Sequence, residues 1–147
     1  MTYDSEGWSI ITPVTSGADE TDIVYVDYEN GNDTTGVVYQ ASNSKVSNPW
    51  LPNNILPFQT PAAAIDAHLV SHGTYNVRRS FWVMLKRGTV FPESIQLKSN
   101  IFGGFPLCGA AEDKRVVIDA YGPVSDPRPK FLKSTDIVCN IVGDPNS

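Results

Sequence analysis

After residue 79 the chain consists of short apolar segments separated by corners that contain Gly or Pro. The segments are Ser80–Lys86, Ser94–Lys98, Arg115–Tyr121 and Asp136–Val142. Short runs rich in β-branched residues and bounded by turn residues are typical of β-strands. The interval is 22 residues from Ile95 to Val117 and 21 residues from Val117 to Val138. This spacing favours a β-solenoid, and a β-sandwich with strands every 8–12 residues or so is the alternative.

One segment before these strands has the pattern of an amphipathic helix. In TPAAAIDAHLVSHG, Thr60 is a suitable N-cap, Pro61 takes the first helical position and Gly73 lies at the C-terminal end. The apolar residues that share one stripe are Phe58, Ala62, Ile65 and Leu69. We expect this helix to lie against a core, with alternate residues of segment 80–86 packed beneath it.

The first convincing strand is DIVYVDY, residues 22–28. Alternation places Ile23 and Tyr25 on one face, with Val24 and Val26 on the other. The turn ENGNDTTG ends this strand. Residues 36–57 are expected to form a long irregular loop, and loops of that length usually are functional or cover other parts of the protein.

We divide the chain into three parts of one structural domain, which is truncated or continues beyond residue 147. They are an extended lead-in (1–22), a part with the first strand, the long loop and the helix (23–79), and the strand-rich part (80–147).

Charge and composition exclude two classes of partner. The chain has 147 residues, with 16 acidic against 11 basic side chains and a net charge of −5. No segment concentrates Lys or Arg, which nucleic acids and anionic membranes require. No apolar run approaches the length of about 20 residues that spans a bilayer. We therefore expect neither nucleic-acid binding nor membrane insertion.

Cysteines and the N-terminus bear on cellular location. Cys108 and Cys139 fit neither a disulfide-dense scaffold nor a zinc site. Two buried thiols are favoured, and a single disulfide is the alternative. The N-terminus MTYDSEGWSIITP lacks the basic and apolar regions of a secretory signal. Export would then use another route, or this start is not that of an unprocessed precursor.

The order of several short motifs resembles the N-terminal part of right-handed parallel β-helix proteins of the pectate-lyase-like superfamily. The motifs are GWSIITP, IVYVDYENGNDTTG, PFQTPAAAIDA, FWVMLKRGTVF, VVIDAYG and RPKF. They cover most of residues 7–133. In that family a turn like Gly31–Asp33 follows the first strand, and an Asp is more usual where this chain has Thr89. A corner like the one from Ile118 to Pro129 opens the next coil.

The resemblance implies a mostly β fold, in which a right-handed parallel β-helix begins behind an N-terminal amphipathic capping helix. The cap would consist of Phe58, Thr60, Pro61, Ala62, Ile65, Leu69 and Gly73. An amphipathic helix can cover the apolar interior and the unpaired edges of a first coil. Polysaccharide lyases, glycoside hydrolases, epimerases, phage tailspikes and adhesins share this architecture, so the resemblance implies no single activity.

Asp119 is the candidate for catalysis. Alternation along the strand places Ile118 on one face and Asp119 on the other. If Ile118 points inward, Asp119 lies on the outer wall, where related lyases and hydrolases place acidic groups. A glycosidase needs two carboxylates roughly 5–10 Å apart, and the sequence offers no second acid that we can place there. A solvated outward residue is the favoured interpretation.

Four other residues are candidates for carbohydrate binding. They are Trp50 in the long loop, Trp82, Lys86 and Arg87. Aromatic rings stack on apolar faces of sugars, and cations bind acidic sugars. Packing, strand-end and corner roles are the favoured alternatives for these four residues.

Two clusters were considered for metal binding. Asp27, Glu29 and Asp33 offer oxygen ligands for calcium, although Asn and Asp are also what a tight turn needs. His68 and His72 are four residues apart on the expected helix, without a third ligand at a recognised spacing. We expect a structural turn, histidines at the surface or helix end, and no cofactor, with calcium as the alternative.

These features predict the capping portion of a protein that binds or processes extracellular polysaccharide. The portion itself is expected to be non-catalytic and to lie outside the cell, on the cell surface or on a virion. The alternatives are an oligomerising tailspike, fibre or adhesin module, and a complete small polysaccharide lyase or hydrolase. The expected partners are a polysaccharide or cell-surface glycan and, in the oligomeric alternative, further copies of the chain.

Overall fold

The computed structural model describes residues 2–3, 5–6, 9–18, 20–71, 80–92, 95–96, 116–131 and 139–140. Its helices are the short 3₁₀ helix η1 (Ser44–Val46) and α1 (Pro61–Ser71). Its strands are β1 (Thr2–Tyr3), β2 (Ser9–Ile10), β3 (Asp22–Val26), β4 (Tyr39–Gln40), β5 (Phe81–Lys86), β6 (Val90–Phe91), β7 (Ile95–Gln96), β8 (Val116–Tyr121), β9 (Lys130–Phe131) and β10 (Cys139–Asn140).

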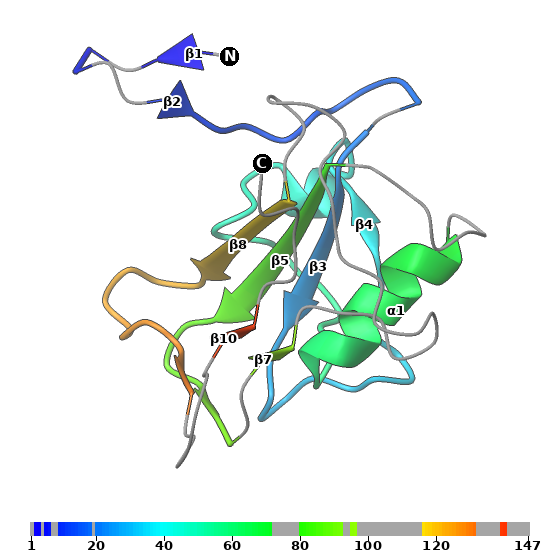
Figure 1. The fold of residues 1–147 in the computed structure, drawn as a ribbon, viewed down its shortest axis with the longest axis vertical. Helices are drawn as coiled ribbons and strands as arrows, with labels where there is room; N and C mark the ends of the chain where they lie inside the picture. Colours follow the sequence, from blue (N-terminus) through cyan, green and yellow to red (C-terminus); the bar gives the residue numbers. More distant parts are fainter. Residues whose placement is uncertain are drawn as a thin grey trace.

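A mixed four-stranded sheet with the order β4-β3-β5-β8 forms the centre of the fold (Figure 1). β5 is parallel to β3 on one side and to β8 on the other, with Val83 opposite both Val24 and Ile118. β4 is antiparallel to β3. β5 therefore lies inside the sheet, and its first five residues are buried.

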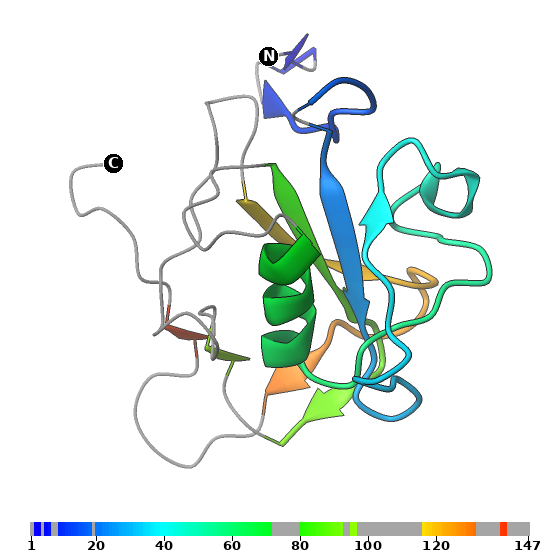
Figure 2. The same cartoon turned by 90° about the vertical axis from the view of Figure 1, so that its right-hand side faces the viewer.

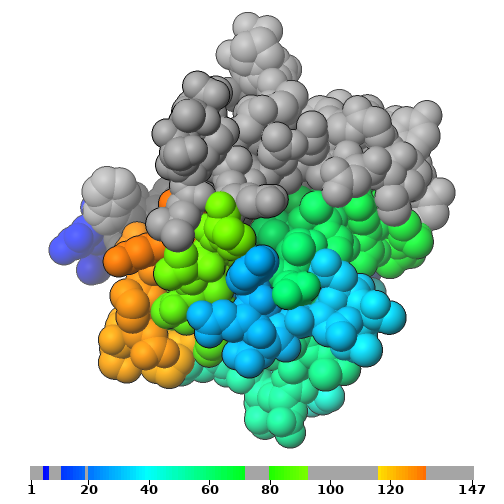
Figure 3. Space-filling view, turned by 90° about the horizontal axis from the view of Figure 1, so that it is seen from below, coloured from blue at the N-terminus to red at the C-terminus, as the bar shows by residue number. Residues whose placement is uncertain are grey.

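Three two-stranded ladders accompany this sheet. β1 and β2 are antiparallel, whereas β6 with β9 and β7 with β10 are parallel. Seen from below, segments that follow the carboxyl ends of β3, β5 and β8 lie next to one another (Figure 3). The segments that follow β5 and β8 thus stay side by side and pair again as β6 and β9.

Two apolar clusters fill the two sides of the four-stranded sheet. On one side α1 covers the sheet, and on the other side lies the segment between β4 and α1 (Figure 2). The cluster under α1 contains Val24, Val26, Phe58, Ala64, Ile65, Leu69, Phe81, Val83, Leu85 and Phe91. The opposite cluster contains Ile23, Tyr25, Tyr39, Ala41, Val46, Trp82, Met84 and Tyr121. The alternation predicted for residues 23–26 is confirmed, because neighbouring residues enter different clusters.

The start of α1 is held by a residue from a distant turn. Asp33 Oδ1 accepts hydrogen bonds from the Gln59 and Thr60 backbone N–H groups at 2.8 and 2.9 Å. Its Oδ2 accepts a bond from the Thr60 hydroxyl at 2.9 Å, and the Thr60 Oγ1 in turn accepts from Ala63 N at 3.4 Å. Since the first N–H groups of a helix have no partner within the helix, Asp33 and Thr60 together satisfy this end.

The predicted start of a right-handed parallel β-helix with a capping helix is wrong. The described strands form an open mixed sheet and three two-stranded ladders, and no closed or coiled sheet occurs among them. The interval of about 22 residues does not stack the strands, because Val117 pairs with Trp82 whereas Ile95 pairs with Cys139. α1 lies along a face of the sheet instead of over the end of a barrel.

Two further features of the long loop and the helix differ from the sequence-based interpretation. Residues 36–57 contain β4 and η1 and are therefore not irregular throughout. Ala62 is half-buried, and Ala64 takes the buried position beside Ile65 and Leu69. Pro61 is the first residue of α1, and Gly73 lies outside the described residues.

Leu69→Ala tests the packing of α1. Leu69 is 2% exposed within the cluster under α1, so we expect a loss of about 2–5 kcal/mol in the free energy of unfolding. Val70→Ala is the matched control, because Val70 is the next residue and is 55% exposed. Urea unfolding followed by circular dichroism measures both. Equal midpoints for the two variants would contradict the packing described here.

Candidate functional site

Trp50 lies on the segment between β4 and α1 and is fixed at three points. Its backbone N–H donates to Asn48 Oδ1 at 3.2 Å, and its carbonyl accepts from Gly122 N at 2.8 Å. Its indole Nε1 donates to Asp119 Oδ2 at 3.0 Å. The segment that carries Trp50 is thereby joined to β8 and to Gly122, the residue that follows β8. The residue is nevertheless 41% exposed.

Trp82 supports Trp50 from inside the protein. The two rings meet edge to face, with centroids 5.7 Å apart and an interplanar angle of 62°. Trp82 belongs to β5 and is 1% exposed, so it does not reach solvent. It lies on the side of the sheet opposite α1, as alternation from Phe81 requires, but the segment around Trp50 covers it. Edge-to-face contacts of this kind add about 0.5–1.5 kcal/mol beyond burial.

Asp119 stands next to this aromatic pair on β8. It is exposed and lies opposite Met84 in the ladder with β5. Its Oδ1 accepts from the backbone N–H of Ala120 at 2.8 Å, while Oδ2 holds the Trp50 indole. The carboxylate is therefore oriented by two donors and retains lone pairs that face solvent. Ile118, expected to point inward, is 37% exposed.

Lys86 and Arg87 lie at the end of β5, near the same corner. Lys86 is opposite Tyr121, and its Nζ is 5.3 Å from the centre of the Tyr121 ring, a cation–π distance. A Cβ atom added at Gly122 would lie 3.2 Å from Lys86 Nζ, which places this cation beside the residue that binds the Trp50 carbonyl. We call Trp50, Trp82, Asp119 and Lys86 the tryptophan platform.

Arg87 has a different role from Lys86. Its backbone N–H donates to the Tyr121 carbonyl at 2.9 Å, and Nη1 donates to the Asp126 carbonyl at 3.4 Å. Both contacts hold the corner between β8 and β9. Arg87 therefore supports the shape of that corner.

Two buried tyrosines lie beneath the platform. The Tyr25 hydroxyl donates to the Pro49 carbonyl at 3.0 Å, directly before Trp50. The Tyr25 and Tyr121 rings meet edge to face at 4.8 Å. Burial raises the pKa of both phenols, with a further increase from Tyr39 for Tyr25 and from Asp27 and Tyr25 for Tyr121. Both hydroxyls are thus protonated at neutral pH, and the Tyr25 hydroxyl anchors the segment that carries Trp50.

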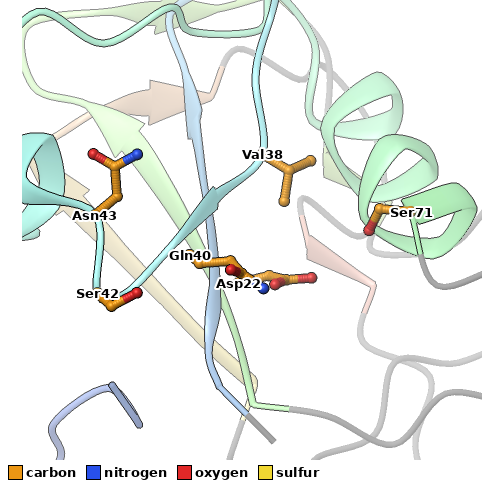
Figure 4. A pocket seen from close by; sticks show the side chains of 6 residues that line it. All are labelled: Asp22, Val38, Gln40, Ser42, Asn43 and Ser71. Carbon is orange, nitrogen blue, oxygen red and sulfur yellow. The ribbon is translucent and has the colours of Figure 1, made fainter. Parts of the chain in front are cut away.

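A pocket of about 490 Å³ opens on the α1 side of the sheet. Figure 4 shows its side chains: Asp22, Val38, Gln40, Ser42, Asn43 and Ser71. They come from β3, β4, the residue before β4, the turn after β4 and the last residue of α1. We call this site the edge pocket, because β4 is the strand at the end of the sheet.

A buried acid–histidine pair forms the inner side of the edge pocket. Asp22 Oδ2 lies 2.8 Å from His68 Nδ1, and the two residues are each 2% exposed. The His68 ring stacks on Phe81 with centroids 3.8 Å apart and an interplanar angle of 6°. His68 is in the last turn of α1, and His72 lies outside the described residues. The sequence analysis missed this pair, although an acid that begins an apolar strand was a possible signal.

The candidate calcium ligands serve the turn after β3. Asp27 Oδ1 accepts from the backbone N–H groups of Glu29 and Asn30, each at 3.1 Å. Asp33 binds the start of α1, and Glu29 is exposed. In the described part of the chain, no group of three or more His, Cys, Asp or Glu side chains is placed to hold a metal ion.

Comparison of the chain with protein-family models, with curated proteins and with solved structures finds no match in any of the three. Within the described residues, no helix combines the length and the apolar character that a membrane span needs. Cys108 and the side chain of Cys139 lie outside the described part, as does Trp8. The candidate site therefore rests on geometry alone.

Proposed function

We propose that the tryptophan platform binds a glycan and that this chain is a carbohydrate-binding part of a protein that acts outside the cell, on a cell surface or on a virion. One observation carries the proposal. The Trp50 side chain is partly exposed although its indole N–H is engaged by Asp119 and its ring by Trp82. The exposed part of the Trp50 ring is therefore held in one orientation and can contact a ligand.

The chemistry of the platform suits a sugar ring. The C–H groups on one face of a pyranose are apolar and stack on an indole, which binds through a large area with few rotatable bonds. Asp119 accepts hydrogen bonds from sugar hydroxyls, and Lys86 donates them. The carboxylate contacts the Trp50 indole, and the ammonium lies on the neighbouring strand close to Gly122, which binds the Trp50 carbonyl.

The platform is also formed before any ligand arrives. Hydrogen bonds that Trp50 donates to Asn48 and Asp119 and accepts from Gly122 N hold it in one position. Fixing a side chain in advance reduces the entropy that binding would otherwise cost, about 0.5–1.5 kcal/mol for each immobilised side chain. Weak contacts to a single sugar ring then yield measurable affinity.

The proposal gives Asp119 a binding role. Its Oδ2 accepts from the Trp50 indole and its Oδ1 accepts from Ala120 N. Protonation of this carboxylate would weaken these hydrogen bonds and disturb the platform. A glycosidase would also need a second carboxylate roughly 5–10 Å away. Binding without turnover is therefore the function that the geometry supports best.

Trp50→Ala tests the proposal. We expect the dissociation constant for the oligosaccharide bound by the unmodified chain to rise at least about tenfold, which corresponds to about 1.4 kcal/mol. Isothermal titration calorimetry with neutral gluco-, galacto- and manno-oligosaccharides and with oligogalacturonides identifies the ligand and measures the change.

Leu51→Ala is the matched control, because Leu51 follows Trp50 and is 54% exposed. It should leave the dissociation constant unchanged. Asp119→Ala should weaken binding, since it removes both a sugar acceptor and the partner of the indole. Equal affinity in the Trp50→Ala and Leu51→Ala variants would overturn the proposal, as would the absence of binding to every oligosaccharide tested.

A further inference from the structure

We propose that the edge pocket is a second binding site, which takes a small neutral polyhydroxylated ligand about the size of a monosaccharide. This inference is independent of the glycan-binding platform. The platform lies on the side of the sheet that carries Trp82, whereas the edge pocket lies on the side covered by α1. The two sites have no residue in common.

The pocket is built by the pairing of two strands and the end of a helix. Asp22 and Gln40 are directly opposite each other in the ladder of β3 and β4, so their side chains point to the same side of the sheet. Val38, two residues before Gln40, faces the same side. Ser71, at the end of α1, closes the pocket opposite β4, and Ser42 and Asn43 extend it beyond the strand (Figure 4).

The lining selects for hydroxyl groups. Five of the six described lining residues are polar, and none of the six is Lys or Arg. Amide and hydroxyl groups both donate and accept hydrogen bonds, which matches a ligand whose hydroxyls also do both. The volume of about 490 Å³ falls within the range of small-molecule pockets, roughly 300–1,000 Å³.

The charges of the described lining residues disfavour anions in the edge pocket. The Asp22 carboxylate lines it, and α1 ends there with Ser71. The C-terminal end of a helix carries a partial negative charge, so a phosphate or carboxylate ligand would meet repulsion from both. A neutral polyol meets none.

Several lining groups are already oriented by contacts with the protein. Asp22 Oδ2 is held by His68 Nδ1 at 2.8 Å. Asn43 Oδ1 accepts from Lys45 N at 3.0 Å, which fixes its amide group. The Ser71 hydroxyl donates to the His68 carbonyl at 2.7 Å, so its oxygen presents lone pairs to other donors. A ligand therefore meets a carboxylate, an amide and a hydroxyl whose directions are set in advance.

Gln40→Leu tests the site. The probes are the methyl glycosides of glucose, galactose and mannose together with myo-inositol, measured by saturation-transfer NMR and by titration calorimetry on the full chain. We expect at least one of them to bind with a millimolar dissociation constant. Gln40→Leu should raise that constant at least about tenfold, and Ser42→Val should raise it by a smaller factor.

Controls separate the two sites. Gln59→Leu and Ser47→Val change the same residue types outside the pocket, and near-ultraviolet circular dichroism shows whether each variant is folded. Trp50→Ala should leave binding of the pocket ligand unchanged. The inference is overturned if no polyol binds, if Gln40→Leu binds as well as the unmodified chain, if Trp50→Ala abolishes the binding, or if ethanolamine or inorganic phosphate binds in preference to every polyol.

Discussion

Gly31→Ala should lower the free energy of unfolding by more than about 4 kcal/mol, a size that marks a specific structural conflict. A Cβ atom at residue 31 would overlap the backbone carbonyl oxygens of Phe58 and Asp27. Both oxygens are fixed by hydrogen bonds, because Asp27 N donates to the Phe58 carbonyl at 2.8 Å and Gly31 N donates to the Asp27 carbonyl at 2.7 Å. Backbone atoms cannot rotate away as a side chain would.

The consequence extends to the start of α1. Phe58 is the buried residue directly before the segment that Asp33 holds, so a shift of its carbonyl displaces the entrance to the helix. Guanidinium unfolding measures the loss. Gly17→Ala is the control, because no atom lies within 4 Å of a Cβ there, although its φ of +87° still strains an alanine. Similar midpoints for the two variants would contradict the close approach of Gly31 to the Phe58 and Asp27 carbonyls.

Asp22→Ala should cost about 3–5 kcal/mol, because it removes the carboxylate that contacts His68 Nδ1 in a buried site. His68 Nδ1 lies 2.8 Å from Asp22 Oδ2, and His68 is 2% exposed, so the contact between α1 and the sheet is buried. Loss of the pair also removes the group that orients His68 on Phe81. Urea unfolding at pH 7 measures the cost.

A double-mutant cycle isolates the contribution of the pair. His68→Phe retains a ring that can stack on Phe81, and Asp22→Ala combined with His68→Phe removes both polar groups. The double variant should be more stable than the sum of the two single losses predicts, since neither member of the pair is then buried without the other. Strict additivity, or a cost below about 1 kcal/mol for Asp22→Ala alone, would show that the pair contributes little.

The parts of the fold that depend on neighbouring residues were predictable from the sequence. The alternation of residues 23–26 between the two faces and the start of the helix at Pro61 both depend on the local sequence alone. The pairing of strands does not follow from local pattern. Ile95 and Val117 have similar surroundings in the sequence but enter different sheets, so a regular interval between them was misleading.

The candidate site shows the same limit. Trp50 and Asp119 were each identified from the sequence, but they are 69 residues apart and nothing local indicates that they share a hydrogen bond. Trp82 was a carbohydrate-binding candidate with packing as the alternative, and it is buried because the segment that carries Trp50 covers it. The edge pocket requires the pairing of β3 with a strand of only two residues, which sequence pattern does not reveal.

The indole N–H resonance of Trp50 tests the central proposal most directly. In ¹H–¹⁵N spectra this signal is assigned by its loss in a Trp50→Phe variant, and it is followed during titration with the oligosaccharide that calorimetry selects. The platform predicts that the Trp50 signal shifts in a saturable way, with the same dissociation constant as the heat signal. A saturating titration that leaves the Trp50 indole signal unmoved would contradict the proposed glycan-binding surface.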